Sequence, residues 1–128
     1  MNVMVINGSP RGESSNSLKL TRAFMEGMGM GEAPVIHLSE LDVRPCKGCF
    51  ACWKHAQGRC AIRDDMDTLL PQLIEADLVV WSFPLYYYSV PRLLKRFIDR
   101  QPPTLLPFMQ DREDGIGNGS HPSRQAAR

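Results

Sequence analysis

Three short apolar runs divide the first hundred residues. Residues 2–6, 35–38 and 78–83 are almost entirely hydrophobic and do not alternate with polar residues. Such runs are typical of parallel β-strands that are covered on both faces. The sequence therefore predicts three buried parallel strands.

The segments between and after these runs have the 3.6-residue spacing of amphipathic helices. The apolar residues at this spacing are Leu20, Ala23, Phe24 and Met28 in the first segment, Met66, Leu69, Leu70, Leu73 and Ile74 in the second, and Val90, Leu93, Leu94, Phe97 and Ile98 in the third. The first helix is expected over residues 16–28, where glycines follow it. In the second segment, Pro71 predicts a break, with a regular helix beginning at the proline.

The predicted order is strand, helix, strand, long loop, helix, strand, helix. This order is typical of an α/β protein with a three-layer, doubly wound parallel sheet, in which ligands bind at the carboxyl ends of the strands. The loop over residues 39–63 is long for a compact domain, which favours a functional role. We expect one domain over residues 1–112, with the pattern dissolving from Gln101, and an irregular or disordered tail over residues 113–128.

Composition narrows the function classes. The 128 residues are 43% hydrophobic and carry a formal net charge of +1, so they predict a globular domain without electrostatic preference for nucleic acid or an anionic membrane. No apolar run approaches the roughly 20 residues of a membrane span, and no basic leader precedes the first strand. The expected location is the cytoplasm, where the four cysteines favour metal ligands or redox thiols over structural disulfides.

A loop rich in serine, residues 7–17, joins the first predicted strand to the first helix. Backbone N–H groups at a helix start, short polar side chains and one arginine favour phosphate binding. The candidate phosphate-binding residues are Ser9, Arg11, Ser15, Asn16 and Ser17. The Walker and dinucleotide patterns are both absent, so a terminal phosphate monoester such as that of FMN fits best. The alternative is an ordinary polar loop that caps the helix.

A second loop, residues 84–89, follows the third predicted strand at the same edge of the sheet. Its three tyrosines and its backbone suit a flat, partly apolar flavin ring. The candidate ring-binding residues are Pro84, Leu85, Tyr86 and Tyr87. The alternative is that the tyrosines form a partner interface or cover the edge of the sheet.

All four cysteines lie in the long loop, at the spacing C-x2-C-x2-C-x7-C. They are Cys46, Cys49, Cys52 and Cys60. Such a compact run favours a [4Fe–4S] cluster, whereas zinc more often takes two separate C-x2-C pairs. Zinc binding and free or disulfide-forming thiols remain as alternatives.

These motifs together resemble the NADPH-dependent FMN reductase family of flavodoxin-like proteins, and most closely its iron–sulfur flavoprotein branch. The matching pieces are Gly8-Ser9-Pro10-Arg11 with Ser15-Asn16-Ser17, the segment from Cys46 to Cys60 with Asp64-Asp65-Met66, Pro84-Leu85-Tyr86-Tyr87-Tyr88-Ser89-Val90-Pro91, and Lys95-Arg96-Phe97-Ile98-Asp99-Arg100. The resemblance covers most of residues 1–112. It implies a flavodoxin-like fold of five strands, of which this chain supplies about three, so we expect a truncated chain with an exposed sheet edge.

The resemblance also implies an activity. It implies an NAD(P)H-dependent oxidoreductase in which FMN takes a hydride and passes electrons to a quinone, a free flavin, a redox protein or a [4Fe–4S] cluster. By position, the serine-rich loop would hold the FMN phosphate, residues 84–87 the ring, and the four cysteines the cluster. A homodimer or homotetramer is expected. A non-enzymatic electron carrier and a zinc-stabilised binding module are the rival functions.

Overall fold

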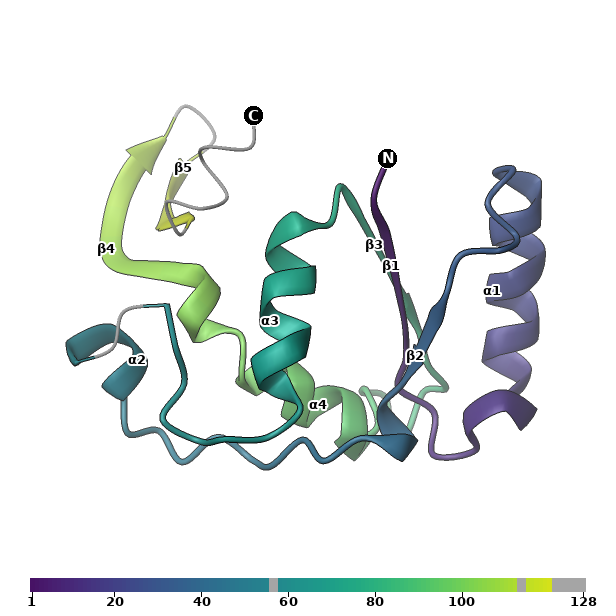
Figure 1. Cartoon of the computed structure of the whole chain (residues 1–128), viewed down its shortest axis with the longest axis horizontal. Coiled ribbons are helices and arrows are strands. Elements are labelled where there is room, and N and C mark those ends of the chain that lie inside the picture. The colour runs from purple at the N-terminus through teal and green to yellow at the C-terminus, as the bar shows by residue number, and fades with distance from the viewer. Residues whose placement is uncertain (56–57, 113–114, 121–128) are drawn as a thin grey trace.

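The centre of the fold is a sheet of three parallel strands. The structure is a computed structural model that describes residues 1–55, 58–112 and 115–120. Strands β1 (Val3–Asn7), β2 (Val35–His37) and β3 (Leu78–Ser82) lie in the order β2-β1-β3 (Figure 1). The three parallel strands expected from the apolar runs are thereby confirmed.

The register brings the carboxyl ends of all three strands together. Asn7, the last residue of β1, pairs with His37 of β2 and with Ser82 of β3. The connections that leave β1 and β3 therefore begin side by side at one edge of the sheet, which is where a doubly wound sheet binds its ligands.

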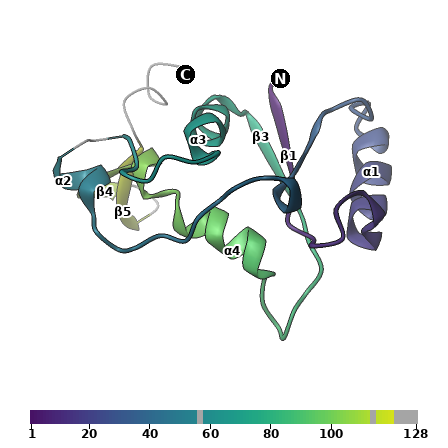
Figure 2. The same cartoon turned by 60° about the horizontal axis from the view of Figure 1, so that its bottom comes forward.

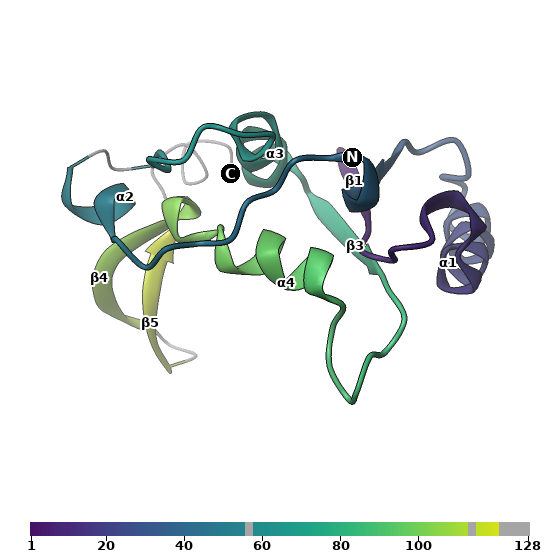
Figure 3. The same cartoon turned by 90° about the horizontal axis from the view of Figure 1, so that it is seen from below.

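Helices cover both faces of this sheet. Helix α1 (Asn16–Gly27) lies on one face, and α3 (Met66–Glu75) and α4 (Arg92–Asp99) lie on the other (Figure 3). Short helical segments also occur at η1 (Gly12–Ser14), η2 (Leu38–Glu40) and α2 (Ala51–Lys54). The layers agree with an incomplete flavodoxin-like α/β fold.

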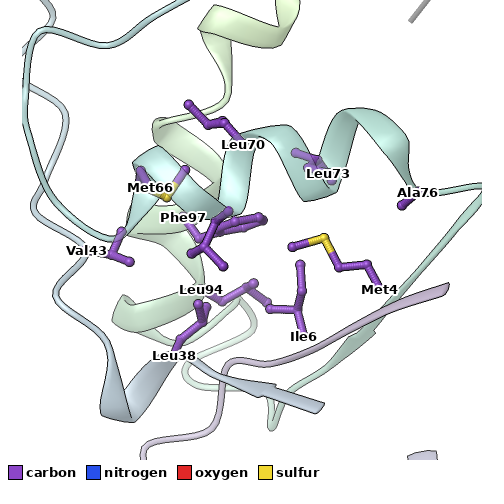
Figure 4. Close-up of a cluster of buried hydrophobic side chains, with 11 residues drawn as sticks. Met4, Ile6, Leu38, Val43, Met66, Leu70, Leu73, Ala76, Leu94 and Phe97 are labelled. Carbon is purple, nitrogen blue, oxygen red and sulfur yellow. The ribbon is translucent and has the colours of Figure 1, made fainter. Parts of the chain in front are cut away.

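The main core fills the space between the sheet, α3 and α4 (Figure 4). Its buried residues are Met4, Ile6, Leu38, Val43, Met66, Leu69, Leu70, Leu73, Ala76, Leu94 and Phe97. Four of them come from the predicted apolar stripe of α3. Burying each such side chain contributes on the order of 1.5–3 kcal/mol, so this core is what fixes α3 and α4 on the sheet.

The break predicted at Pro71 is wrong, because α3 runs unbroken through the proline. Pro71 lies on the exposed side, opposite the stripe that packs into the core. It sits only one turn inside the helix, so the hydrogen bond it removes is that of an early carbonyl near water.

The apolar stripe that predicts α1 is not the face that α1 buries. Leu18 and Met25 are buried, whereas Leu20, Phe24 and Met28 are exposed. Spacing alone predicts a helix correctly but cannot say which of two apolar stripes meets the sheet.

Beyond Gln101, where the apolar patterns of the sequence end, residues 105–112 and 115–120 form regular structure. After η3 (Pro102–Thr104), strands β4 (Leu105–Arg112) and β5 (Gly115–Ser120) form an antiparallel pair. The pairing register shifts between Leu105 and Met109, the interval that contains Pro107, and proline is tolerated at such irregularities. The rest of the expected tail, residues 113–114 and 121–128, lies outside the described residues.

Across the residues that the structure describes, no helix has both the length and the apolar character needed to cross a membrane.

The core makes a prediction about stability. Phe97 is fully buried, so Phe97→Ala should lower the free energy of unfolding by about 3–5 kcal/mol. Phe24→Ala removes the same side chain from an exposed position and should change that free energy by about 0.5 kcal/mol or less. Urea unfolding followed by circular dichroism measures both variants, and equal losses would contradict this description of the core.

Candidate functional site

The serine-rich loop is tied to β3 at its first residue. The N–H of Gly8 donates to the carbonyl of Ser82 at 2.8 Å. A Cβ at position 8 would stand 2.7 Å from Cβ of Leu94, so only glycine leaves room for α4 to pass. The loop after β1 and the loop after β3 therefore share a rigid starting point.

Asn7 organises the rest of this loop from a fully buried position. Its Oδ1 accepts from the N–H of Ser9 at 3.1 Å, and its Nδ2 donates to the carbonyl of Gly12 at 2.8 Å. The same Nδ2 lies 3.1 Å from Nδ1 of His37 on β2. One amide side chain thus fixes the loop's shape and joins it to the neighbouring strand. Asn7 is not among the predicted phosphate-binding residues, although an Asn at the end of a buried strand is a signal for such a turn.

Most loop N–H groups have partners within the loop. Arg11 donates to Oγ of Ser9, Gly12 to the carbonyl of Ser9, and Ser15 to the carbonyl of Gly12, each at 3.2 Å. Ser9 and Ser15 are themselves buried, at 1% and 2% exposure. Of the candidate phosphate-binding residues, these two shape the loop from inside.

The start of α1 is the part of the loop that remains open to a ligand. Ser15 is the N-cap residue of α1, but no side chain caps this helix. The exposed side chains of Arg11 and Asn16 and the half-exposed Ser17 surround this start. An uncapped first turn with a nearby guanidinium attracts an anion, which is the chemistry that an FMN phosphate requires.

The tyrosine loop makes a tight, strained turn. Tyr86 and Ser89 exchange two backbone hydrogen bonds, of 2.9 and 3.1 Å, around Tyr87 and Tyr88. Both central residues have left-handed backbones, with φ of 48° and 61°, which is costly for residues other than glycine or asparagine. The two residues are 97% and 96% exposed.

The tyrosine loop projects from the body of the fold between β3 and α4 (Figure 2). Leu85 and Tyr86 are also exposed, whereas Pro84 is half-buried. Strained, exposed aromatic residues beside the carboxyl edge favour a role in binding over a role in folding.

The four cysteines line one small cavity. Its walls also include Lys47, Phe50, Arg100 and two prolines, Pro102 and Pro103. Burial raises the pKa of the Cys52 thiol, and so do the nearby thiols of Cys60, Cys49 and Cys46. The four sulfurs are therefore close enough to interact, but within the described residues no three of them are arranged as ligands of one metal ion.

Two backbone N–H groups already point at cysteine sulfurs. Gly48 donates to Sγ of Cys46 at 3.4 Å, and Ile62 donates to Sγ of Cys60 at 3.5 Å. Gly48 has a φ of 65°, a conformation that glycine adopts without strain. Four thiols around one cavity, with N–H donors to sulfur, are the donor set of a thiolate-ligated metal centre.

A buried ion pair closes the inner side of this cavity. Nη1 and Nη2 of Arg100 donate to the two carboxylate oxygens of Asp64 at 2.7 and 3.0 Å, and both side chains are almost fully buried. Burial alone would raise the pKa of Asp64, but the hydrogen bonds from Arg100, Arg44 and Met66 outweigh it and lower that pKa. No sequence pattern could have paired Asp64 with Arg100, which lies 36 residues further along the chain.

The cysteine cavity and the serine-rich loop lie at opposite ends of the molecule. The segment after β2 leaves the carboxyl edge but runs past α4 before it reaches the cysteines beside α2 (Figures 1 and 3). The Asp64–Arg100 pair holds the end of this segment at the far end of α4.

Comparisons with known proteins agree with the fold. The model of a protein family described as having a flavodoxin-like fold matches residues 1–102. An iron–sulfur flavoprotein of Archaeoglobus fulgidus is 38% identical over 102 residues, which are 78% of this chain and 48% of that protein. An iron–sulfur flavoprotein of Methanocaldococcus jannaschii is 35% identical over 109 residues, 84% of this chain and 55% of that protein.

A third relative is an FMN-dependent NADH:quinone oxidoreductase of Pseudoalteromonas atlantica. It is 28% identical over 110 residues, which are 77% of this chain and 54% of the relative. The chain spans about half the length of the curated relatives it matches.

The tyrosine turn predicts an unusual gain of stability. Combining Tyr87→Asn with Tyr88→Gly supplies the residue pair that this turn favours, and should raise the free energy of unfolding by about 1 kcal/mol. Tyr86→Asn, outside the left-handed positions, should give no gain. Thermal unfolding compares the variants, and a loss of stability in the double variant would contradict the assignment of strain.

The ion pair predicts how stability depends on pH. Because the pKa of Asp64 is lower in the folded chain than the roughly 3.9 of an unfolded chain, the unfolded state binds more protons in acid. The stability that Asp64 gives the folded chain is therefore fully present above the pKa of the unfolded chain. It is lost as the pH falls through the pKa of the folded chain.

The neutral pair Asp64→Asn with Arg100→Gln should therefore weaken the dependence of unfolding free energy on pH between about 5 and 2. Asp67→Asn, at an exposed ion pair with Arg63, should preserve most of it. Urea titrations at a series of pH values measure the free energy of unfolding. If it changes with pH by the same amount in wild type and in the neutral pair, Asp64 does not have this role.

Proposed function

Because the chain belongs to the flavodoxin-like fold family, we propose that it binds FMN and acts in an oxidoreductase that takes electrons from NAD(P)H. The observation that carries this proposal is the uncapped start of α1, which follows β1 at the same carboxyl edge of the sheet from which the tyrosine loop leaves β3. Relatives named for FMN and for NADH or NAD(P)H support it.

The phosphate of FMN would bind at the first turn of α1. Ser17 and Asn16 offer side-chain donors there, and Arg11 offers a full positive charge. The buried Ser9 and Ser15 would support the site by holding the loop in its conformation. A doubly charged phosphate gains from each of these donors and from the dipole of a 12-residue helix.

The flavin ring would lie against the tyrosine loop. Pro84, Leu85, Tyr86 and Tyr87 would supply apolar contact and backbone donors along the edge of the ring. Bound there, FMN would supply the chemistry of hydride acceptance from a nicotinamide and of one-electron release. The residues of this chain would bind and orient the flavin.

The four cysteines would hold a [4Fe–4S] cluster as an electron acceptor. Their shared cavity, their spacing and the iron–sulfur flavoprotein relatives support a cluster over zinc. The final acceptor would be a quinone, a free flavin or a redox protein. We further propose a homodimer or homotetramer that works in the cytoplasm.

Comparing FMN with riboflavin isolates the phosphate site. Arg11→Gln removes one charged donor and should raise the Kd for FMN about tenfold or more. The Kd for riboflavin, which has no phosphate, should not change. Quenching of flavin fluorescence gives both constants.

Lys19→Gln is the control, because Lys19 is an exposed cation one turn further along α1. It should alter the affinity for FMN much less than Arg11→Gln does. If wild type binds FMN and riboflavin equally well, the phosphate adds nothing to the affinity, and the start of α1 is not a phosphate site.

A further inference from the structure

Arg100 occupies a position that the FMN proposal does not use. It is the C-cap residue of α4 and is 1% exposed. Besides its two bonds to Asp64, Nη1 donates to the carbonyl of Arg44 at 2.7 Å, and Nη2 lies 3.4 Å from the carbonyl of Ile62. Its guanidinium thus joins both ends of the cysteine-containing segment, before Cys46 and after Cys60.

The same guanidinium lines the cavity of the four cysteines. Asp64, Arg44 and Ile62 accept from Nη1 and Nη2, so Nε is the donor that remains. This Nε is buried and, among the described residues, has no hydrogen-bond partner. A buried unsatisfied donor is costly, about 1–3 kcal/mol or more for a charged group, and a bound ion or its ligand is one of the few explanations for it.

The charge of Arg100 suits the chemistry of this cavity. A guanidinium is charged at every physiological pH, and that of Arg100 stands in the same cavity wall as the four cysteines. Four thiolates around one divalent metal ion carry a net charge of −2, and a buried cation in the wall of their cavity offsets part of that charge.

We propose that Arg100 is the positioning residue of the four-cysteine metal site, holding the cysteine segment in place and balancing the charge of the bound thiolates. The inference rests on the proposed metal-binding role of the cysteines, but it applies to any thiolate-ligated metal. Asp64 fixes the orientation of the guanidinium, and Nε is the donor available to a ligand sulfur.

Titration of the reduced, metal-free chain with Co²⁺ tests this role without a loaded enzyme. Thiolate-to-cobalt absorption reports the site directly. Arg100→Gln should weaken Co²⁺ binding at least tenfold, and Arg100→Lys should recover part of the loss. Arg92→Gln removes the same charge from an exposed position on the same helix and should leave the affinity unchanged.

Arg100→Gln alone leaves Asp64 buried without its partner, which can unfold the chain. The combination Asp64→Asn with Arg100→Gln removes both charges and keeps amide hydrogen bonds across the pair. Thermal unfolding followed by circular dichroism verifies that this variant is folded. Weak Co²⁺ binding by a folded neutral pair supports the proposal, and wild-type affinity in that variant overturns it.

Reconstitution with iron and sulfide, assayed for both elements, separates the inference from the proposed function. If wild type binds Co²⁺ in an Arg100-dependent way but takes up no cluster, the cluster is wrong and the role of Arg100 stands. If wild type shows no thiolate-to-cobalt absorption, the cysteines form no site for Arg100 to support, and the inference is overturned.

Discussion

The buried side chain of Asn7 is the contact on which the candidate flavin site depends. It accepts a hydrogen bond from the N–H of Ser9, donates one to the carbonyl of Gly12, and contacts His37 on the next strand. With the Gly8–Ser82 hydrogen bond, it ties the serine-rich loop to the end of β3. Because a buried amide without partners is strongly unfavourable, the loop has little freedom to adopt another shape. The loop that leads into α1, where we propose that the phosphate binds, is therefore shaped in advance of any ligand.

A second buried polar contact plays the same part at the other end of the molecule. The Asp64–Arg100 pair draws the long segment after β2 against the end of α4, and the cysteines meet around the cavity formed there. Both candidate sites are thus loops held by buried polar side chains, while the apolar core of α3, α4 and the sheet supplies the rigid frame. The two ends of α4 connect them, since the tyrosine loop precedes this helix and Arg100 ends it.

Much of this arrangement could be predicted from the sequence, because burial on both faces leaves a clear apolar pattern. The strands, the stripe of α3 and the parallel order all follow from it. What the pattern could not give depends on single tertiary contacts. Pro71 predicts a break in the helix, but packing of the buried stripe keeps α3 continuous. Leu20 and Phe24 have core spacing but stay exposed, because Leu18 and Met25 meet the sheet instead. Likewise, the sequence could not show that the hydroxyl of Ser9 accepts from the backbone N–H of Arg11 within the loop.

We propose that this chain carries a flavin site and a thiolate metal site at the two ends of α4. The visible absorption spectrum of protein purified without oxygen, with FMN and iron assayed on the same sample, tests both sites together. We expect flavin bands on a broad iron–sulfur absorption, with both cofactors remaining on the protein through gel filtration. A folded protein that stays colourless after incubation with FMN, iron and sulfide would contradict it.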